Sequence, residues 1–200
     1  MMRKVVIFLS IFIGIFYFLS QTETFKYFKE QSIDKVNPKF NLVDMDNKPF
    51  SDKDLLGKRY IVGFGYTNCI DICPVTLATL TGMLEVLEEK YGKEYAQNYN
   101  AVFITIDPNR DSPEILSDYI KGIFHDRIIA LTGSQKNIDK MGKNFRIEYS
   151  KYGDIENNLY TMIHPIYLYV VDEKGEYKMQ IAHTIKPELA IDLIIKKLGK

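Results

Sequence analysis

The sequence predicts an α/β domain with a mixed, mostly parallel sheet that helices cover on both faces. Three observations predict it: apolar runs typical of buried strands alternate with stretches of helical periodicity, the connections between them are short, and a hairpin pattern comes only late in the chain. Parallel strands need crossover helices between them, which explains the alternation. The length of 200 residues leaves room for one such domain and its termini.

The predicted strands are short runs rich in apolar and β-branched residues that end at glycine or turn residues. An Asp-Asn turn divides the first run into two short strands, and Glu173-Lys174-Gly175 forms the turn of the late hairpin. The polar stretch 150–158, which contains Gly153, predicts a mobile surface loop. In chain order the strands are expected within 40–50 and at 60–64, 101–106, 128–131, 166–171 and 176–181.

The predicted helices carry leucines or isoleucines three and four residues apart, or begin with a capping signal. Ser112 is expected to cap a helix that has Pro113 in its first turn, as proline fits a helix only there. The helices are expected at 74–91, from 113 onward, at 135–145 and at 187–198. This order of strands and helices is the thioredoxin-like arrangement.

Composition excludes several classes of protein. Lys plus Arg equals Asp plus Glu at 26 each, so no excess of positive charge is available for a nucleic-acid backbone, and no nucleic-acid partner is expected. The chain has only two cysteines, Cys69 and Cys73. Two cysteines cannot build a disulfide scaffold or an all-cysteine zinc site, so any chemistry they do is that of a close pair.

The N-terminus predicts a membrane anchor. Arg3 and Lys4 precede an uncharged, apolar run over 5–19, a length between that of a signal-peptide core and that of a full membrane span. The residues after it lack the small side chains that a signal peptidase reads, which favours an uncleaved anchor. We therefore expect an anchor at 1–20, a tether at 21–38 and the domain at 39–200.

The charge pattern of the anchor predicts the compartment. The positive pair before the apolar run keeps the N-terminus in the cytosol and exports everything after residue 20. The expected location is the inner membrane, crossed once, with the domain in a bacterial periplasm or a mitochondrial intermembrane space. Cysteines there can be oxidised, so a working pair must be held reduced or bound to metal.

The cysteine pair lies where a buried strand gives way to a helix. Pro74 predicts that Cys73 is the helix-capping residue and that Cys69 lies in the preceding loop. Free backbone N–H groups at a helix start favour a thiolate, the form that binds metal or attacks a disulfide. The alternative is a structural disulfide or two inert buried thiols.

A metal site would need a third ligand, and His164 is the best placed. It precedes Pro165 and the strand at 166–171, which a thioredoxin-like topology could bring beside the cysteine loop. We expect His125 and His183 to be surface or hydrogen-bonded histidines. Two thiolates and an imidazole suit Cu(I), and Cu(II) with one more donor. Zinc would want a fourth ligand, or an open position with water, and no carboxylate stands out as its base.

Several motifs together resemble the SCO/SenC family of membrane-anchored copper proteins. They are Cys69-Ile-Asp-Ile-Cys73-Pro after Gly63-Phe-Gly-Tyr-Thr-Asn, the Asp-Pro-Asn-Arg-Asp segment at 107–111, Leu-Thr-Gly at 131–133, and the late His164. The resemblance implies that Cys69, Cys73 and His164 bind one copper ion per chain. It also implies an upstream copper donor and, as acceptor, the binuclear copper centre in subunit II of cytochrome c oxidase.

The chain departs from that family's usual pattern at four positions beside the implied ligands. Asn68 and Ile70 stand where the family usually has histidine and proline, and Ile163 and Pro165 where it commonly has aspartate and a small hydroxyl residue. None of the four is an implied ligand. Loss of the aspartate removes a hydrogen-bond acceptor for the imidazole, which would change copper affinity and redox preference.

Three functions use these thiols. The first is a metallochaperone, which binds and transfers copper without turnover. The second is a thiol-disulfide oxidoreductase, in which Cys69 or Cys73 attacks and the other resolves; such enzymes normally space the pair by two residues, and here the spacing is three. The third, a peroxidase, needs a threonine three residues before its cysteine, whereas Thr67 is two before Cys69. The residues favour copper handling, with thiol-disulfide exchange as the alternative.

Overall fold

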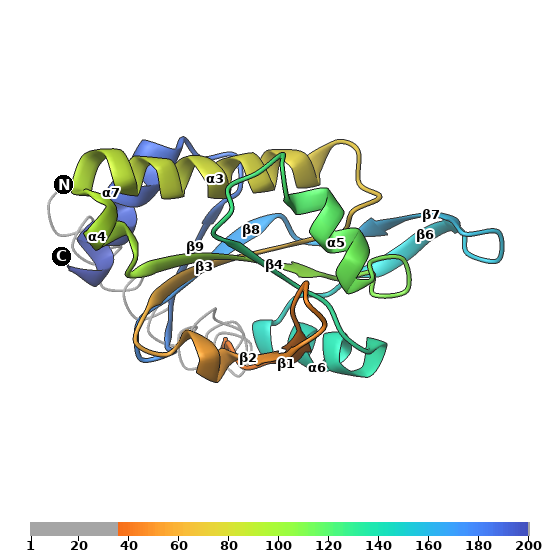
Figure 1. The fold of residues 1–200 in the computed structure, drawn as a ribbon. Coiled ribbons are helices and arrows are strands. Elements are labelled where there is room, and N and C mark those ends of the chain that lie inside the picture. The colour runs from red at the N-terminus through yellow and green to blue at the C-terminus, as the bar shows by residue number, and fades with distance from the viewer. Residues whose placement is uncertain (1–35, 200) are drawn as a thin grey trace, which may run out of the picture. The chain divides into compact units, whose positions relative to one another are not determined.

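The computed structural model describes residues 36–199 (Figure 1), so the expected anchor at 1–20 and most of the expected tether lie outside the described residues. None of the described helices has the length and apolar character that a bilayer span requires. The last residues of the expected tether already contact the domain. Pro38 is buried, Val36 packs against the core, and the Asn37 N–H donates to the Asn144 carbonyl at 2.9 Å.

The centre of the domain is a five-stranded mixed sheet in the order β5-β4-β3-β8-β9. Its parallel half and its antiparallel late hairpin confirm the predicted α/β arrangement (Figure 1). Gly175, at φ +77°, occupies the hairpin turn where the sequence places it. In chain order the sheet strands are β3 (Arg59–Gly65), β4 (Tyr99–Thr105), β5 (Ile128–Leu131), β8 (Tyr167–Val171) and β9 (Tyr177–Ala182).

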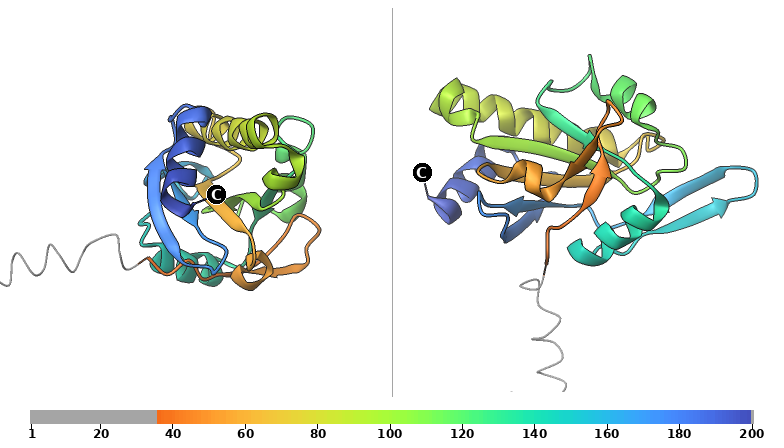
Figure 2. Two further views of the ribbon diagram at one scale, coloured as in Figure 1. Left: turned by 90° about the vertical axis from the view of Figure 1, so that its left-hand side faces the viewer. Right: turned by 60° about the horizontal axis from the view of Figure 1, so that its bottom comes forward.

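Each face of the sheet has its own core, because side chains alternate along each strand. In β3, Tyr60 and Val62 point to one core, which α6 (Gln135–Phe145) and the hairpin of β1 (Asn41–Val43) and β2 (Pro49–Ser51) cover. Ile61 belongs to the other core. The remaining helices cover that face of the sheet (Figure 2). These are α3 (Ile72–Tyr91), α5 (Pro113–Ile120) and α7 (Pro187–Leu198), with the short α4 (Lys93–Ala96) at a connection. The 3-10 helix η2 (Asp52–Leu55) follows β2, and its Leu55 belongs to the first core.

The predicted helix starts are confirmed at α5, where the Ser112 hydroxyl accepts the Ile115 N–H at 3.2 Å and Pro113 follows. They are wrong at α3, which begins two residues before Pro74. Proline is tolerated there because the N–H it lacks is one of the first four, which have no partner within the helix. Cys73 is therefore inside the first turn, and Asp71 is the capping residue.

The loop predicted at 150–158 is wrong, because the structure forms a hairpin there. It joins β6 (Ser150–Asp154) to β7 (Leu159–Ile163) in antiparallel register. Only one face of it is buried, through Tyr160 and Met162, so the polar β6 has no apolar alternation to signal a strand. Gly153 pairs with Tyr160 at φ +121°, a conformation that glycine adopts freely.

Candidate metal centre

The two cysteines are in contact where β3 passes into α3. The Cys73 N–H donates to the Cys69 sulfur, with N and S 3.4 Å apart, and both thiols are free. The side chain of Asp71 does not cap the helix. Instead, the sulfur of Cys69, which lies in the preceding loop, accepts a backbone N–H of the first helical turn. A sulfur at this position is stabilised as a thiolate by the free N–H groups of the first turn.

The environments of the two thiols differ. Cys73 is fully buried, and Gly65 makes room for its sulfur, since a Cβ at Gly65 would lie 2.7 Å from it. Burial raises the pKa of the Cys73 thiol well above its usual range. Partial burial also acts to raise the pKa of Cys69, but hydrogen bonds from Cys73 and from the first turn outweigh it, so the pKa of Cys69 is lowered.

Alkylation of the reduced protein is therefore expected to separate the two cysteines. Because the lowered pKa of Cys69 gives more thiolate at neutral pH, its rate of reaction with iodoacetamide should rise at a lower pH than that of an ordinary thiol. Cys73 should stay unreacted over the same range. Peptide mass spectrometry after timed alkylation measures both rates, and in denaturant the two should become equal. Faster reaction at Cys73 in the folded protein would contradict this assignment.

His164 lies between β7 and β8 and lines the same cleft as Cys69, a hollow of about 680 Å³. Its ring meets that of Tyr66 edge to face, with centroids 6.5 Å apart. The Nδ1–H donates to the Pro165 carbonyl at 2.9 Å, which leaves the Nε2 lone pair free. Burial lowers the pKa of His164, so the ring is neutral at pH 7 and able to bind a metal.

The structure thus brings Cys69 and Cys73 into contact and places His164 at the cleft that Cys69 lines. Within residues 36–199, no three histidine, cysteine or acidic side chains are grouped closely enough to hold a metal ion as they stand. The Pro165 carbonyl accepts the hydrogen bond of the imidazole. The apolar side chain of Ile163, which stands where the family commonly has aspartate, cannot accept it. The ligand set Cys69, Cys73 and His164 therefore stays a prediction.

The segment 107–111 has a structural role that the sequence motif alone did not reveal. The buried Asp111 carboxylate accepts the Thr67 N–H at 3.1 Å and the hydroxyls of Thr67 and Thr105, each at 2.5 Å. Thr67 is two residues before Cys69, so this buried acid holds the cysteine loop against the end of β4. In the sequence, the only signal of this role is the presence of two acids and an arginine within five residues. That pattern does not predict which loop their side chains contact.

Arg110 and Asp107 fix the β6–β7 hairpin that leads to His164. Arg110 pairs with the buried Asp107 carboxylate through Nε at 2.5 Å and donates to the Tyr160 carbonyl at 3.0 Å. The guanidinium also lies over the Tyr160 ring, 3.8 Å from its centroid. The Tyr160 hydroxyl donates to Asp107 at 2.9 Å. One short segment therefore anchors both sides of the cleft.

Tyr66 adds a direct link between the cysteine loop and the hairpin. Its hydroxyl lies 2.6 Å from the Thr161 hydroxyl and accepts the Met162 N–H at 3.3 Å. The ring is buried and forms part of the cleft wall between Cys69 and His164. Sequence reasoning missed this residue, because a tyrosine after a buried strand carries no signal of its partner.

The other two histidines have partners elsewhere. Nδ1 of His125 accepts the Arg127 N–H at 3.1 Å, and Nε2 lies 3.8 Å from Glu88. His183 is buried, with Nδ1 3.1 Å from the Thr76 hydroxyl. Neither side chain lines the cleft that Cys69 and His164 share.

The fold and the site define a thioredoxin-like domain with a free dithiol at a strand-to-helix junction and a neutral histidine on the same cleft. The family model described as SCO1/SenC matches residues 28–199. The chain belongs to the SCO1/SenC family.

Individual relatives agree with this assignment. A SCO2-like protein of Rickettsia prowazekii is 31% identical over 185 residues, which cover 87% of this chain and 86% of that protein. The mitochondrial protein SCO1 of Saccharomyces cerevisiae is 34% identical over 78% of this chain, which spans about half (52%) of the yeast protein.

Solved structures share the fold. A copper-bound structure of ScoI from Bradyrhizobium japonicum superposes with a TM-score of 0.72 at 29% identity, covering 82% of this chain and 99% of that one. A copper-bound structure of yeast Sco1 gives a TM-score of 0.73 at 33% identity and covers 81% of this chain and 87% of that one.

Proposed function

We propose that this protein is a metallochaperone that binds one copper ion through Cys69, Cys73 and His164 and delivers it during the assembly of cytochrome c oxidase. The observation that carries the proposal is the shared cleft: a contacting pair of free thiols and a neutral imidazole with Nε2 unengaged line or underlie one hollow. Soft sulfur ligands with one imidazole are the set that suits Cu(I), and Cu(II) once a further donor joins.

The relatives support copper as the cargo and oxidase assembly as the setting. The structures of Bradyrhizobium and yeast Sco proteins are described as copper-bound. A further structure with the same fold, at a TM-score of 0.63, is described as belonging to the Sco family of cytochrome c oxidase assembly proteins. We assign subunit II of that oxidase as the acceptor and a separate copper-donating protein upstream.

The proposal includes a location. The apolar run at 5–19 anchors the chain in the inner membrane, and the positive pair before it places the domain outside the cytosol. The domain then works in a periplasm or an intermembrane space, and the relative from yeast is named as mitochondrial. A dithiol in such a compartment must be reduced before it can take up copper.

Copper binding by the histidine variant tests the proposal. A reduced fragment beginning at Thr24, which contains both cores of the domain, is expected to bind about one copper per chain in a chelator competition. His164→Ala should weaken that affinity by at least about 30-fold. Removing a residue that only hydrogen-bonds to a metal ligand already costs about 10–100-fold in affinity, and His164 would be a ligand itself. His125→Ala is the matched control and should bind as the parent does. Equal affinity of the His164 variant and the parent would remove His164 from the site.

One observation favours a second function, thiol-disulfide exchange. Cys69 has the lowered pKa of an attacking thiol, and Cys73 is buried behind it as a resolving thiol would be. In that reaction the Cys69 thiolate attacks a partner's disulfide, and Cys73 then displaces the partner as a reduced dithiol and leaves a Cys69–Cys73 disulfide. The test is the rate at which the reduced protein reduces a model disulfide. If His164→Ala keeps that activity and Cys69→Ser abolishes it, the result favours this function over copper delivery.

A further inference from the structure

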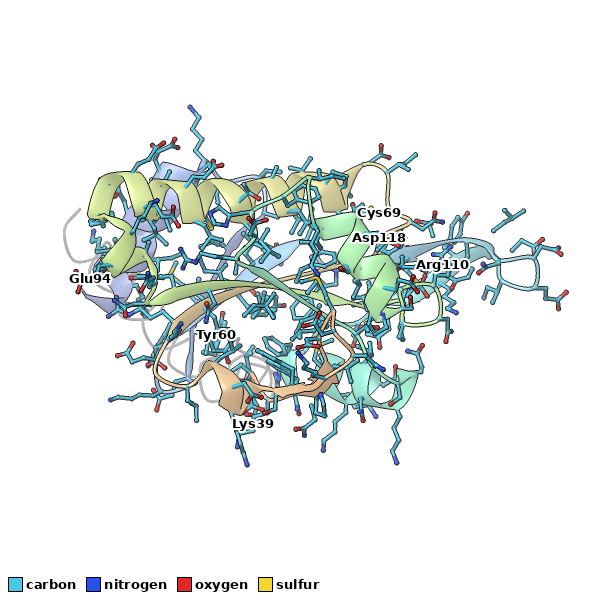
Figure 3. All side chains as sticks on the ribbon, viewed as in Figure 1. Lys39, Tyr60, Cys69, Glu94, Arg110 and Asp118 are labelled. Atoms are coloured by element: carbon cyan, nitrogen blue, oxygen red, sulfur yellow. The ribbon has the colours of Figure 1, made fainter. Side chains whose placement is uncertain are left out.

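Five exposed lysines gather on the side of the domain where the described chain begins; we name them the lysine face. Two come from the first segment and η2, and three from α6, and among residues 36–199 none of the five forms an ion pair. Figure 3 shows Lys39 on the side of the sheet opposite α3. The members of the lysine face are Lys39, Lys53, Lys136, Lys140 and Lys143.

The elements that carry these lysines are packed together. Lys39, Lys53 and Lys140 line one hollow of about 340 Å³, which Asn37 also lines. On α6, positions 136, 140 and 143 are four and three residues apart and so share one helix face. The Asn37 N–H is bonded to the Asn144 carbonyl at the end of α6, so the chain enters the domain beside these lysines.

The charge of this face is opposite to that of the rest of the domain. Residues 36–199 hold 20 basic and 23 acidic side chains, a net of −3. The five lysines with the neighbouring Asp52, Asp54 and Asp139 make +2, which leaves 15 basic and 20 acidic residues, or −5, elsewhere. An anionic surface would repel most of the domain and attract this side, so charge alone favours one orientation.

The length of the tether selects the surface that this face meets. The sequence places 16 residues, 20–35, between the apolar run and Val36. A flexible coil of that length would have a root-mean-square reach of about 20–25 Å. That distance is less than a domain's diameter, so an anchor at 5–19, as in the proposed function, would keep Val36 and the lysines beside it within reach of the bilayer. Lysines gain from anionic headgroups only within about one Debye length, which such a tether permits.

We propose that the lysine face docks on anionic phospholipid headgroups and so orients the domain on its membrane. Figure 3 shows Cys69 well away from Lys39, in the loop that joins the end of β3 to α3. The docked domain therefore keeps its cleft open to a soluble or membrane-bound partner. This inference goes beyond copper binding, since none of the five lysines lines the cleft that contains Cys69 and His164.

Vesicle co-sedimentation tests the docking. The fragment from Thr24 keeps both cores and lacks the apolar run, so its binding reports the face alone. It should bind vesicles of phosphatidylglycerol and phosphatidylcholine at low salt, bind pure phosphatidylcholine weakly, and lose affinity as salt rises. The triple variant Lys136→Gln, Lys140→Gln, Lys143→Gln should bind about 100-fold more weakly, at about fivefold per lysine.

A second triple variant is matched for charge. Lys93, Lys174 and Lys186 are exposed, make no ion pair among the described residues and lie outside the lysine face; their change to Gln should cost less than about fivefold. Equal losses in the two triple variants would mean that net charge alone governs binding and would overturn the proposal. Equally strong binding of the parent fragment to pure phosphatidylcholine vesicles and to anionic vesicles would also overturn it.

Two further measurements test whether the tether covers the lysine face and whether the lysine substitutions affect copper binding. A fragment from Val36 that binds anionic vesicles when the Thr24 fragment does not would show that the chain's own tether covers the face, which also overturns the proposal. Copper affinity of the α6 triple variant should equal that of the parent. Failure of copper binding in all variants would count against the proposed function and leave the docking result to stand separately.

Discussion

Replacing Arg110 with alanine is expected to destabilise the domain by about 3–5 kcal/mol, the usual cost of removing one partner of a buried ion pair. The Asp107 carboxylate is fully buried and would lose its cation, because Arg110 Nε is its ion-pair partner. The Tyr160 carbonyl and ring would also lose their contacts with the guanidinium. Urea denaturation followed by circular dichroism measures the loss.

Lys151→Ala is the matched control, since Lys151 also lies over the Tyr160 ring, 4.4 Å from its centroid, but makes no ion pair with the described residues. Its loss should cost about 1 kcal/mol or less. Arg110→Lys keeps the charge but not the forked geometry, so its cost should fall between the two. If Arg110→Ala costs no more than Lys151→Ala, the buried pair does not hold the hairpin.

Asp111→Ala is expected to cost about 2–4 kcal/mol and to loosen the cysteine loop. The substitution leaves the Thr67 N–H and the Thr105 hydroxyl without their acceptor, and each such buried group costs about 1–3 kcal/mol. Because Thr67 is two residues before Cys69, the loop should open more often. Hydrogen exchange at 66–70 and alkylation of Cys73 should then both become faster in the variant.

Asp118→Ala on α5 provides the control, because Asp118 is exposed and, within residues 36–199, makes no hydrogen bond to the loop. It should change neither stability beyond about 0.5 kcal/mol nor the rate of alkylation. Alkylation of Cys73 in Asp111→Ala at the parent's rate would show that the acid stabilises the sheet end without holding the loop.

Much of the fold could be predicted from periodicity and capping. Strand β5 and helices α6 and α7 have the predicted bounds, and Ser112 caps α5 as expected. These elements are each buried on one face or fully, so their apolar spacing is complete within the element. The β6–β7 hairpin was missed because only Tyr160 and Met162 of it are buried, beneath a segment from another part of the chain.

The start of α3 shows a different limit of sequence reasoning. Pro74 is compatible with a helix beginning at any of several nearby residues, and local rules favoured Cys73 as the cap. In the structure the Cys69 sulfur accepts the Cys73 N–H, so the helix begins earlier than the proline suggests. The choice depends on a contact between the loop and the helix rather than on either alone.

The sequence by itself determined the α/β class, the thiol pair beside a helix start, and His164 as the histidine to consider, because spacing and residue chemistry are local properties. The tertiary structure alone decided which thiol is buried, that the Pro165 carbonyl orients the imidazole, and that Asp107, Arg110 and Asp111 tie the loop to the hairpin. These are contacts between residues far apart in the chain, and burial changes a pKa only once distant segments have packed together.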